Sequence, residues 1–165
     1  MFKSYFKELA IAFFLFLGFS IIGAYSASQD GDFVRLILGD AYINMTLNNI
    51  EQGDPMAVYK KANSLDMFLG ITINNVRVGL LSFAAGILLG IGTVYIAMQN
   101  AIMLGSFQYF FYEKGLLWES VRTIWIHGTI EISVIIICIA AGMVLAKGII
   151  FSWNLYSVKI LHNAC

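Results

Sequence analysis

Three long stretches without a charged residue constrain the fold of this chain more than any other feature. They cover residues 9–25, 78–98 and 132–146. Uncharged runs of about this length are typical of helices that cross the roughly 30 Å hydrocarbon core of a bilayer. Over its 165 residues the chain is 59% hydrophobic and only 12% charged, and its mean hydropathy is +0.79. Because these values lie outside the usual range of soluble domains, the sequence predicts an integral membrane protein.

The apolar residues form continuous runs rather than the alternating pattern of barrel strands, which favours membrane-spanning helices. We therefore predict an all-α fold, a polytopic transmembrane helical bundle that forms a single membrane domain over residues 1–165. The expected order is span 1 at about 9–27, an extracytoplasmic loop at about 28–73, span 2 at about 76–98, a short interfacial or re-entrant segment at about 101–115, span 3 at about 123–146 and a tail at 147–165.

The lysines near the amino terminus orient the chain. Lys3 and Lys7 precede the first span, so the positive-inside bias places the amino terminus in the cytoplasm. A cleaved secretory signal is the alternative, although its apolar core is usually shorter. Three spans would leave the tail outside, which fits poorly with Lys147 and Lys159. Either the 101–115 segment also crosses the membrane, or the charge bias is weak here.

The loop at 28–73 is acidic but contains apolar residues at helical spacing. Asp40 and the pair Asp54-Pro55 are helix-start signals, which predict two short amphipathic helices on the membrane surface. A small soluble subdomain is the alternative. The aromatic residues of the 101–115 segment are expected at the headgroup level, where such rings are favoured.

His127 and Glu131 are the candidate functional residues at the start of the third span. Four residues apart on a helix, they share one face, and a charged carboxylate at this depth costs roughly 2.5 kcal/mol or more unless it faces protein or water. The favoured interpretation is a polar clasp between spans; a proton or ion site is the second, and a catalytic or metal site the least favoured, because no third ligand or nucleophile with a base stands out. We therefore expect no metal and no cofactor. The polar residues expected to join this pair are Asn74, Asn75, Arg77, Gln99 and Asn100.

Small residues predict where helices pack closely. Gly86, Gly90 and Gly92 lie in the second predicted span, and Gly142 and Ala146 form a similar pattern in the third. Such patterns let helix backbones approach one another. Contact within the chain is the favoured reading, and a homo-oligomer is the alternative.

Several motifs together resemble the stage II sporulation protein M family of bacterial integral membrane proteins. They are Asn74-Asn75-Val-Arg77-Val-Gly79, the segments 86–93 and 99–105, and above all His127-Gly128-Thr-Ile-Glu131, within a match over about 68–148. The resemblance implies scaffolds that recruit peptidoglycan-degrading enzymes to the engulfing septum membrane, with relatives in non-sporulating bacteria that have no settled role. It also implies further spans, so we expect a short or truncated member of the non-sporulating branch.

We therefore expect a scaffold or interaction protein of the bacterial inner membrane, not an enzyme. Its expected partners are the lipid bilayer and other membrane or envelope proteins, including proteins that remodel the cell wall. The absence of a basic stripe argues against nucleic acid. The alternative is a small transporter or channel subunit in which His127 and Glu131 couple protons or ions.

Overall fold

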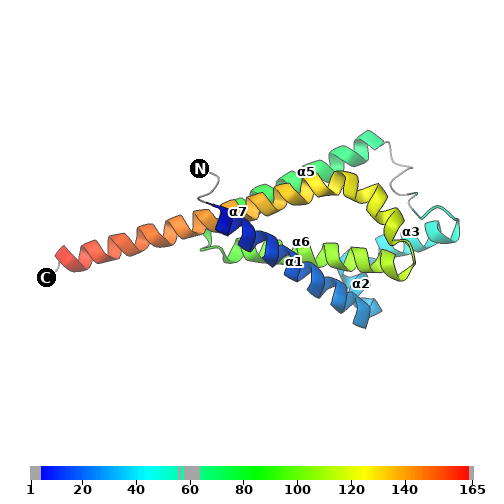
Figure 1. The fold of residues 1–165 in the computed structure, drawn as a ribbon, viewed down its shortest axis with the longest axis horizontal. Coiled ribbons are helices and arrows are strands. Elements are labelled where there is room, and N and C mark those ends of the chain that lie inside the picture. The colour runs from blue at the N-terminus through cyan, green and yellow to red at the C-terminus, as the bar shows by residue number, and fades with distance from the viewer. Residues whose placement is uncertain (1–4, 56, 58–63, 164–165) are drawn as a thin grey trace.

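Helices form every regular element that the computed structural model describes, over residues 5–55, 57 and 64–163. No strand occurs in these residues, which confirms the predicted all-α fold. The elements in chain order are α1 (Phe6–Gln29), α2 (Gly31–Leu38), α3 (Asp40–Glu51), α5 (Ser64–Ala84), the 3-10 turn η2 (Ala85–Ile87), α6 (Ile91–Glu113) and α7 (Leu117–Asn163) (Figure 1).

Three helices in the described part of the chain are long and apolar enough to cross a membrane. The qualifying segments are Phe6–Gln29, Leu69–Ile87 and Gly128–Ser152. Three spanning helices agree with the predicted bundle, although the second segment begins earlier in the chain than the predicted span at 76–98.

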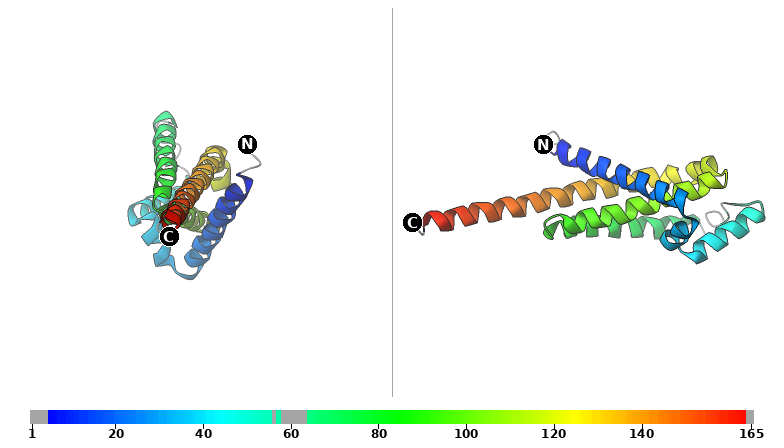
Figure 2. Two further views of the ribbon diagram at one scale, coloured as in Figure 1. Left: turned by 90° about the vertical axis from the view of Figure 1, so that its left-hand side faces the viewer. Right: turned by 90° about the horizontal axis from the view of Figure 1, so that it is seen from below.

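The bundle is built from two pairs of parallel helices that are not consecutive in the chain (Figures 1 and 2). α1 packs mainly along α6, and α5 packs mainly along α7. The larger apolar core lies between α1, α6 and α7, where Ala12, Ala97, Ala101 and Ile139 are fully buried. One end of the bundle, called the hairpin end below, holds the turn after α5 and the Lys147 to Glu8 ion pair of 2.9 Å. The opposite end, called the loop end, carries α2 and α3.

The predicted continuous helix over 76–98 is wrong, because the chain reverses in the middle of this run. α5 ends at Ala84, η2 follows, and α6 begins at Ile91. Leu89 and Gly90 have positive φ angles of 53° and 84°, which turn the chain back on itself. Thr93 donates a hydrogen bond of 2.7 Å to the Ser82 carbonyl oxygen and so ties α6 to α5. An uncharged run gives no hydropathy signal for such a reversal.

The prediction of a separate short segment at 101–115 is also wrong. Residues 101–113 are the second half of α6, which lies along α1 in the bundle (Figure 1). Phe110 and Phe111 are buried in a second apolar cluster with Ala27, Val34 and Ile43 rather than forming an exposed belt. Their burial against α1, α2 and α3 is a tertiary contact that an aromatic composition alone does not reveal.

The third span and the tail form one helix, contrary to the prediction that the span ends at 146. α7 runs for 47 residues, about 70 Å at 1.5 Å per residue. Its carboxyl-terminal part extends past the other helices at the hairpin end (Figure 1). Lys147 and Gly148 do not end the helix, since neither residue prevents helical hydrogen bonding.

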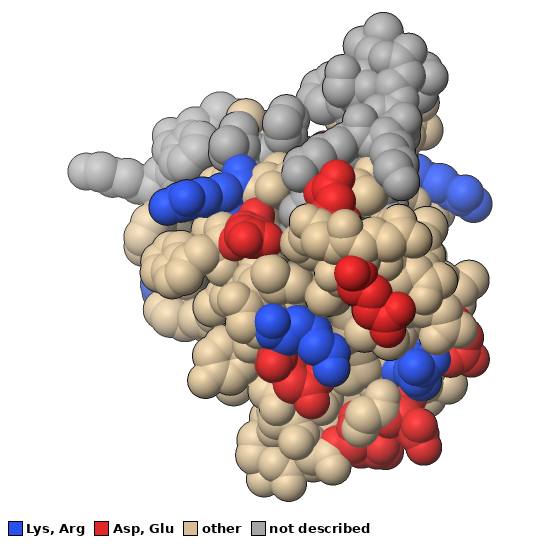
Figure 3. Space-filling model, turned by 90° about the vertical axis from the view of Figure 1, so that its right-hand side faces the viewer, with Lys and Arg blue, Asp and Glu red and all other residues tan. Residues whose placement is uncertain are grey.

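The loop end carries several acidic and basic side chains, which are distributed over its surface (Figure 3). Asp30 caps α2 by accepting a hydrogen bond of 2.9 Å from the Asp32 amide, and Arg35 pairs with Asp40 at 3.0 Å. The helix expected at Asp40 is α3, whereas α2 was not expected. The helix expected after Asp54-Pro55 lies outside the described residues.

Candidate functional site

Glu131 is held across the α5–α7 interface by two side chains of α5. Asn75 donates a hydrogen bond of 2.6 Å from Nδ2 to Oε2, and Thr72 donates one of 3.2 Å from Oγ1 to Oε1. All three side chains are partly buried. Both carboxylate oxygens therefore have a donor on the neighbouring helix, near the loop end of the apolar segment Gly128–Ser152.

The parallel direction of α5 and α7 makes this contact possible. Asn75 lies beside Glu131, Gly79 beside Cys138 and Gly86 beside Gly142, so the two helices run in the same direction. One short link between the second and third spans, such as the predicted segment at about 101–115, would by itself make these two helices antiparallel. Two reversals, at 88–90 and at 114–116, produce the parallel arrangement.

Among the other residues predicted for this site, the described amides Gln99 and Asn100 bond elsewhere. His127 lies in α7 one turn earlier, but its side chain is outside the described part of the structure. Gln99 donates to the Tyr95 hydroxyl at 2.6 Å, and Asn100 donates to the Ile96 carbonyl oxygen at 2.8 Å. Both bonds stay within α6, so these two amides bond within their own helix rather than to the carboxylate.

Asn74 and Arg77 lie on a different face of α5 from Asn75. Both side chains are exposed, whereas that of Asn75 is half-buried. At 100° per residue, positions 74 and 77 share a face that turns away from α7. The seven polar residues expected as one cluster therefore separate, and only Asn75 and Glu131 of that set bond to each other among the described side chains.

The predicted packing glycines contact other segments of the same chain. A Cβ atom at Gly86 would collide with the Gly142 backbone, and one at Gly142 would stand 2.6 Å from Thr93 Oγ1 and 2.7 Å from the Ser82 carbonyl oxygen. Gly90 faces Ala146 at the hairpin end, where a Cβ atom would lie 3.2 Å from the alanine methyl. At Gly92, the atoms nearest to an added Cβ atom belong to Ala85 and Leu88, in the turn that precedes α6.

A second close contact, between α1 and α6, was missed. A Cβ atom at Gly105 would collide with the Ser20 carbonyl oxygen, and one at Gly23 would collide with the Ile102 backbone. Ser106 donates a hydrogen bond of 3.3 Å to the Gly23 carbonyl oxygen. The signal was present in the first span as small residues spaced three or four apart, at Ser20, Gly23, Ala24 and Ala27.

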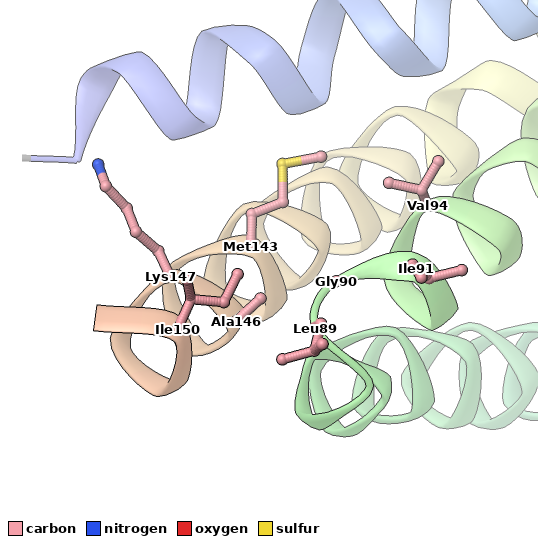
Figure 4. Close-up of a pocket in the computed structure, with 8 residues that line it drawn as sticks. All are labelled: Leu89, Gly90, Ile91, Val94, Met143, Ala146, Lys147 and Ile150. Atoms are coloured by element: carbon pink, nitrogen blue, oxygen red, sulfur yellow. The ribbon is translucent and has the colours of Figure 1, made fainter. Parts of the chain in front are cut away.

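The hairpin end contains a cavity of about 510 Å³ between the turn and α7 (Figure 4). Leu89, Ile91 and Val94 line one side, and Met143 and Ile150 line the other. The Lys147 side chain extends from its edge toward α1, where it pairs with Glu8. The lining is apolar apart from this lysine, so the ion pair fastens α1 to α7 beside the cavity.

No group of three or more His, Cys, Asp or Glu residues with the spacing of a metal site occurs among the described residues.

The helical elements, three of them long and apolar enough to cross a membrane, and the carboxylate bonded between two of these helices indicate a helical membrane protein. Residues 12–164, nearly the whole chain, match the family model described as Stage II sporulation protein M. The chain belongs to this family, as its motifs predicted. Comparisons with curated proteins and with solved structures give no match.

Proposed function

We propose that this chain is a non-catalytic scaffold that positions partner proteins, including proteins that remodel the cell wall, in the bacterial inner membrane. The observation that carries the proposal is the bonding of Glu131 by Asn75 and Thr72. An intramembrane carboxylate that moved protons or ions would need access to water and freedom to change partners. Here its oxygens instead connect two helices.

Close backbone packing supports the same role. Glycine contacts join α5 to α7 through Gly86 and Gly142, and α1 to α6 through Gly23 and Gly105. Helices whose backbones touch leave little room for the sliding or rocking by which transporters alternate their access. A rigid bundle suits a protein that offers surfaces to partners.

The proposed topology has four membrane crossings, because α6 crosses in addition to α1, α5 and α7. α1, α5, α6 and α7 all run between the hairpin end and the loop end (Figures 1 and 2). Four crossings return the tail to the side of the amino terminus. Lys3, Lys7, Lys147 and Lys159 then share the cytoplasmic side, which removes the conflict with the positive-inside bias.

A flux measurement separates the scaffold from the transporter alternative. The wild-type protein and Glu131→Gln are reconstituted in vesicles, and proton and cation flux is compared with that of empty vesicles. We expect no flux above background from either protein. Flux from the wild type that disappears in a folded Glu131→Gln protein would overturn the scaffold proposal and favour ion coupling.

Crosslinking in native membranes tests the scaffold directly. A membrane-permeant crosslinker followed by purification and mass spectrometry is expected to identify envelope proteins joined to the chain in reproducible amounts. If the chain is recovered only as an uncrosslinked monomer at native expression levels, the proposal is wrong.

A further inference from the structure

Arg77 is an exposed cation in the middle of a segment apolar enough to span the membrane. It lies eight residues after Leu69 and ten before Ile87, the bounds of the second candidate span. No hydrogen bond or ion pair joins it to any residue that the structure describes. Its position contrasts with that of Glu131, whose charge is bonded by the neighbouring helix.

The surroundings of Arg77 on α5 are otherwise apolar. Ile73, Val76, Leu80 and Leu81 are exposed by 65%, 49%, 62% and 49%, and together with Arg77 they border a shallow groove of about 500 Å³. Asn74, one turn before Arg77, adds an exposed amide. These six residues, called the Arg77 face below, lie on a helix at the edge of the bundle (Figure 2).

Lipid alone is a poor covering for this face. A charged side chain in the hydrocarbon region is costly and normally faces protein or water. Snorkelling offers little relief, because helical side chains lean toward the helix amino terminus and Leu69 is about 12 Å away in that direction at 1.5 Å per residue. A single side chain does not cover that distance.

The described side chains of this protein provide no counter-charge at this depth. Within the described candidate spans the carboxylates are Glu8, which pairs with Lys147, and Glu131, which is bonded by α5. A symmetric pair of copies meeting through this face would place Arg77 opposite Arg77, and like charges at close range repel. The covering element therefore belongs to a different protein.

We propose that the Arg77 face is a docking surface for a transmembrane helix of another protein that carries an Asp or Glu side chain at matching depth. The carboxylate accepts hydrogen bonds from the guanidinium, the Asn74 amide supplies a second polar contact, and the apolar residues pack against the rest of the helix. The inference rests on the proposed scaffold function and names the surface and the partner chemistry.

A model helix provides the probe. The full chain is reconstituted in vesicles of zwitterionic lipid with a synthetic leucine-alanine transmembrane peptide that carries one central Glu, and association is measured by fluorescence transfer. We expect the Glu peptide to bind roughly 3- to 20-fold more tightly than the same peptide with Gln, the range that intramembrane polar contacts produce. Arg77→Leu removes this difference and Arg77→Lys retains most of it.

Two results of this measurement would overturn the inference. One is equal binding of the Glu and Gln peptides to the wild type. The other is a preference that a small fraction of anionic lipid in the vesicles abolishes, which would identify a lipid headgroup as the preferred ligand of Arg77. Because Arg77 makes no hydrogen bond or ion pair with a described residue, Arg77→Leu is expected to fold, and its melting temperature in detergent serves as the check.

Site-specific photocrosslinking in native membranes separates this inference from the scaffold proposal. A photoreactive residue is placed at Leu80 on the Arg77 face or at Ile21 on α1, which have matched exposures of 62% and 61%. We expect the photoreactive residue at Leu80 to form an adduct with a partner protein, on a transmembrane helix of that protein that carries an Asp or Glu. Arg77→Leu should abolish this adduct. Protein adducts at Ile21 but not at Leu80 would overturn the docking surface without contradicting the scaffold proposal. If neither position gives a protein adduct and general crosslinking gives none either, the scaffold proposal is wrong.

Discussion

Asn75 on α5 donates a hydrogen bond of 2.6 Å to Glu131 on α7, joining residues 56 positions apart in the chain. The contact depends on two chain reversals that bring the helices side by side in the same direction. The contact gives the Glu131 carboxylate a neutral partner inside the bundle. Both described donors to this carboxylate, Asn75 and Thr72, are uncharged.

A double-mutant cycle tests the energy of this bond. Asn75→Ala and Glu131→Ala are each expected to lower the free energy of unfolding in micelles, with a coupling energy of about 0.6 to 1.7 kcal/mol. Ser133→Ala is the control, because the Ser133 hydroxyl donates to the Thr129 carbonyl oxygen of its own helix and should change stability little. Strictly additive effects of Asn75→Ala and Glu131→Ala would contradict the bond.

The close contact of α1 with α6 makes Gly105 sensitive to the smallest enlargement. Gly105→Ala places a methyl group against the Ser20 carbonyl oxygen and the Ala24 backbone nitrogen, so the helices must separate. We expect a loss of about 1–3 kcal/mol in the free energy of unfolding. Thermal unfolding in detergent measures it.

Gly18→Ala is the matched control on α1. Apart from the nearby backbone of its own helix, no atom lies within 4 Å of a Cβ atom at Gly18, and alanine is favoured over glycine within a helix by about 1 kcal/mol. Stability should therefore stay unchanged or rise. Equal destabilisation by both substitutions would mean that the α1–α6 contact is not as close as described.

An engineered disulfide tests the parallel register of α5 and α7. A Cβ atom at Gly79 would lie 3.6 Å from Cys138 Cβ and 3.1 Å from its Sγ, which suits a disulfide. With Cys165→Ser removing the other thiol, Gly79→Cys is expected to crosslink to Cys138 on mild oxidation, as detected by peptide mass spectrometry. Leu80→Cys, on an exposed face, should not; equal crosslinking by both would refute the register.

The proposed topology places both chain termini on the same side of the membrane. A fluorescent protein that matures only in the cytoplasm should fluoresce when fused to either terminus. Alkaline phosphatase inserted at Gly115, in the turn between α6 and α7, should be active because the loop end lies outside. A carboxyl-terminal fusion that reports the outside would show that α6 does not cross.

The predictability of the candidate site from the sequence differed from residue to residue. Glu131 stood out because a carboxylate beside a long apolar run is rare, and Asn75 was among its expected partners. Thr72 was not, since a threonine in an apolar segment carries no distinctive signal. Asn74 and Asn75 are adjacent in the chain, so only the rotation of α5 against α7 decided which of them faces the carboxylate.

The sequence by itself determined the helical membrane class and the family, because apolar content and short motifs are local properties. It did not determine the reversal at 88–90 or the inclusion of α6 in the bundle. An uncharged run has the same hydropathy whether the helix continues or the chain reverses. Amides such as Gln99 and Asn100 lower the mean hydropathy of α6, although α6 packs against other helices. Only the tertiary structure shows which helices pack against α6. It also shows that no described residue bonds to Arg77.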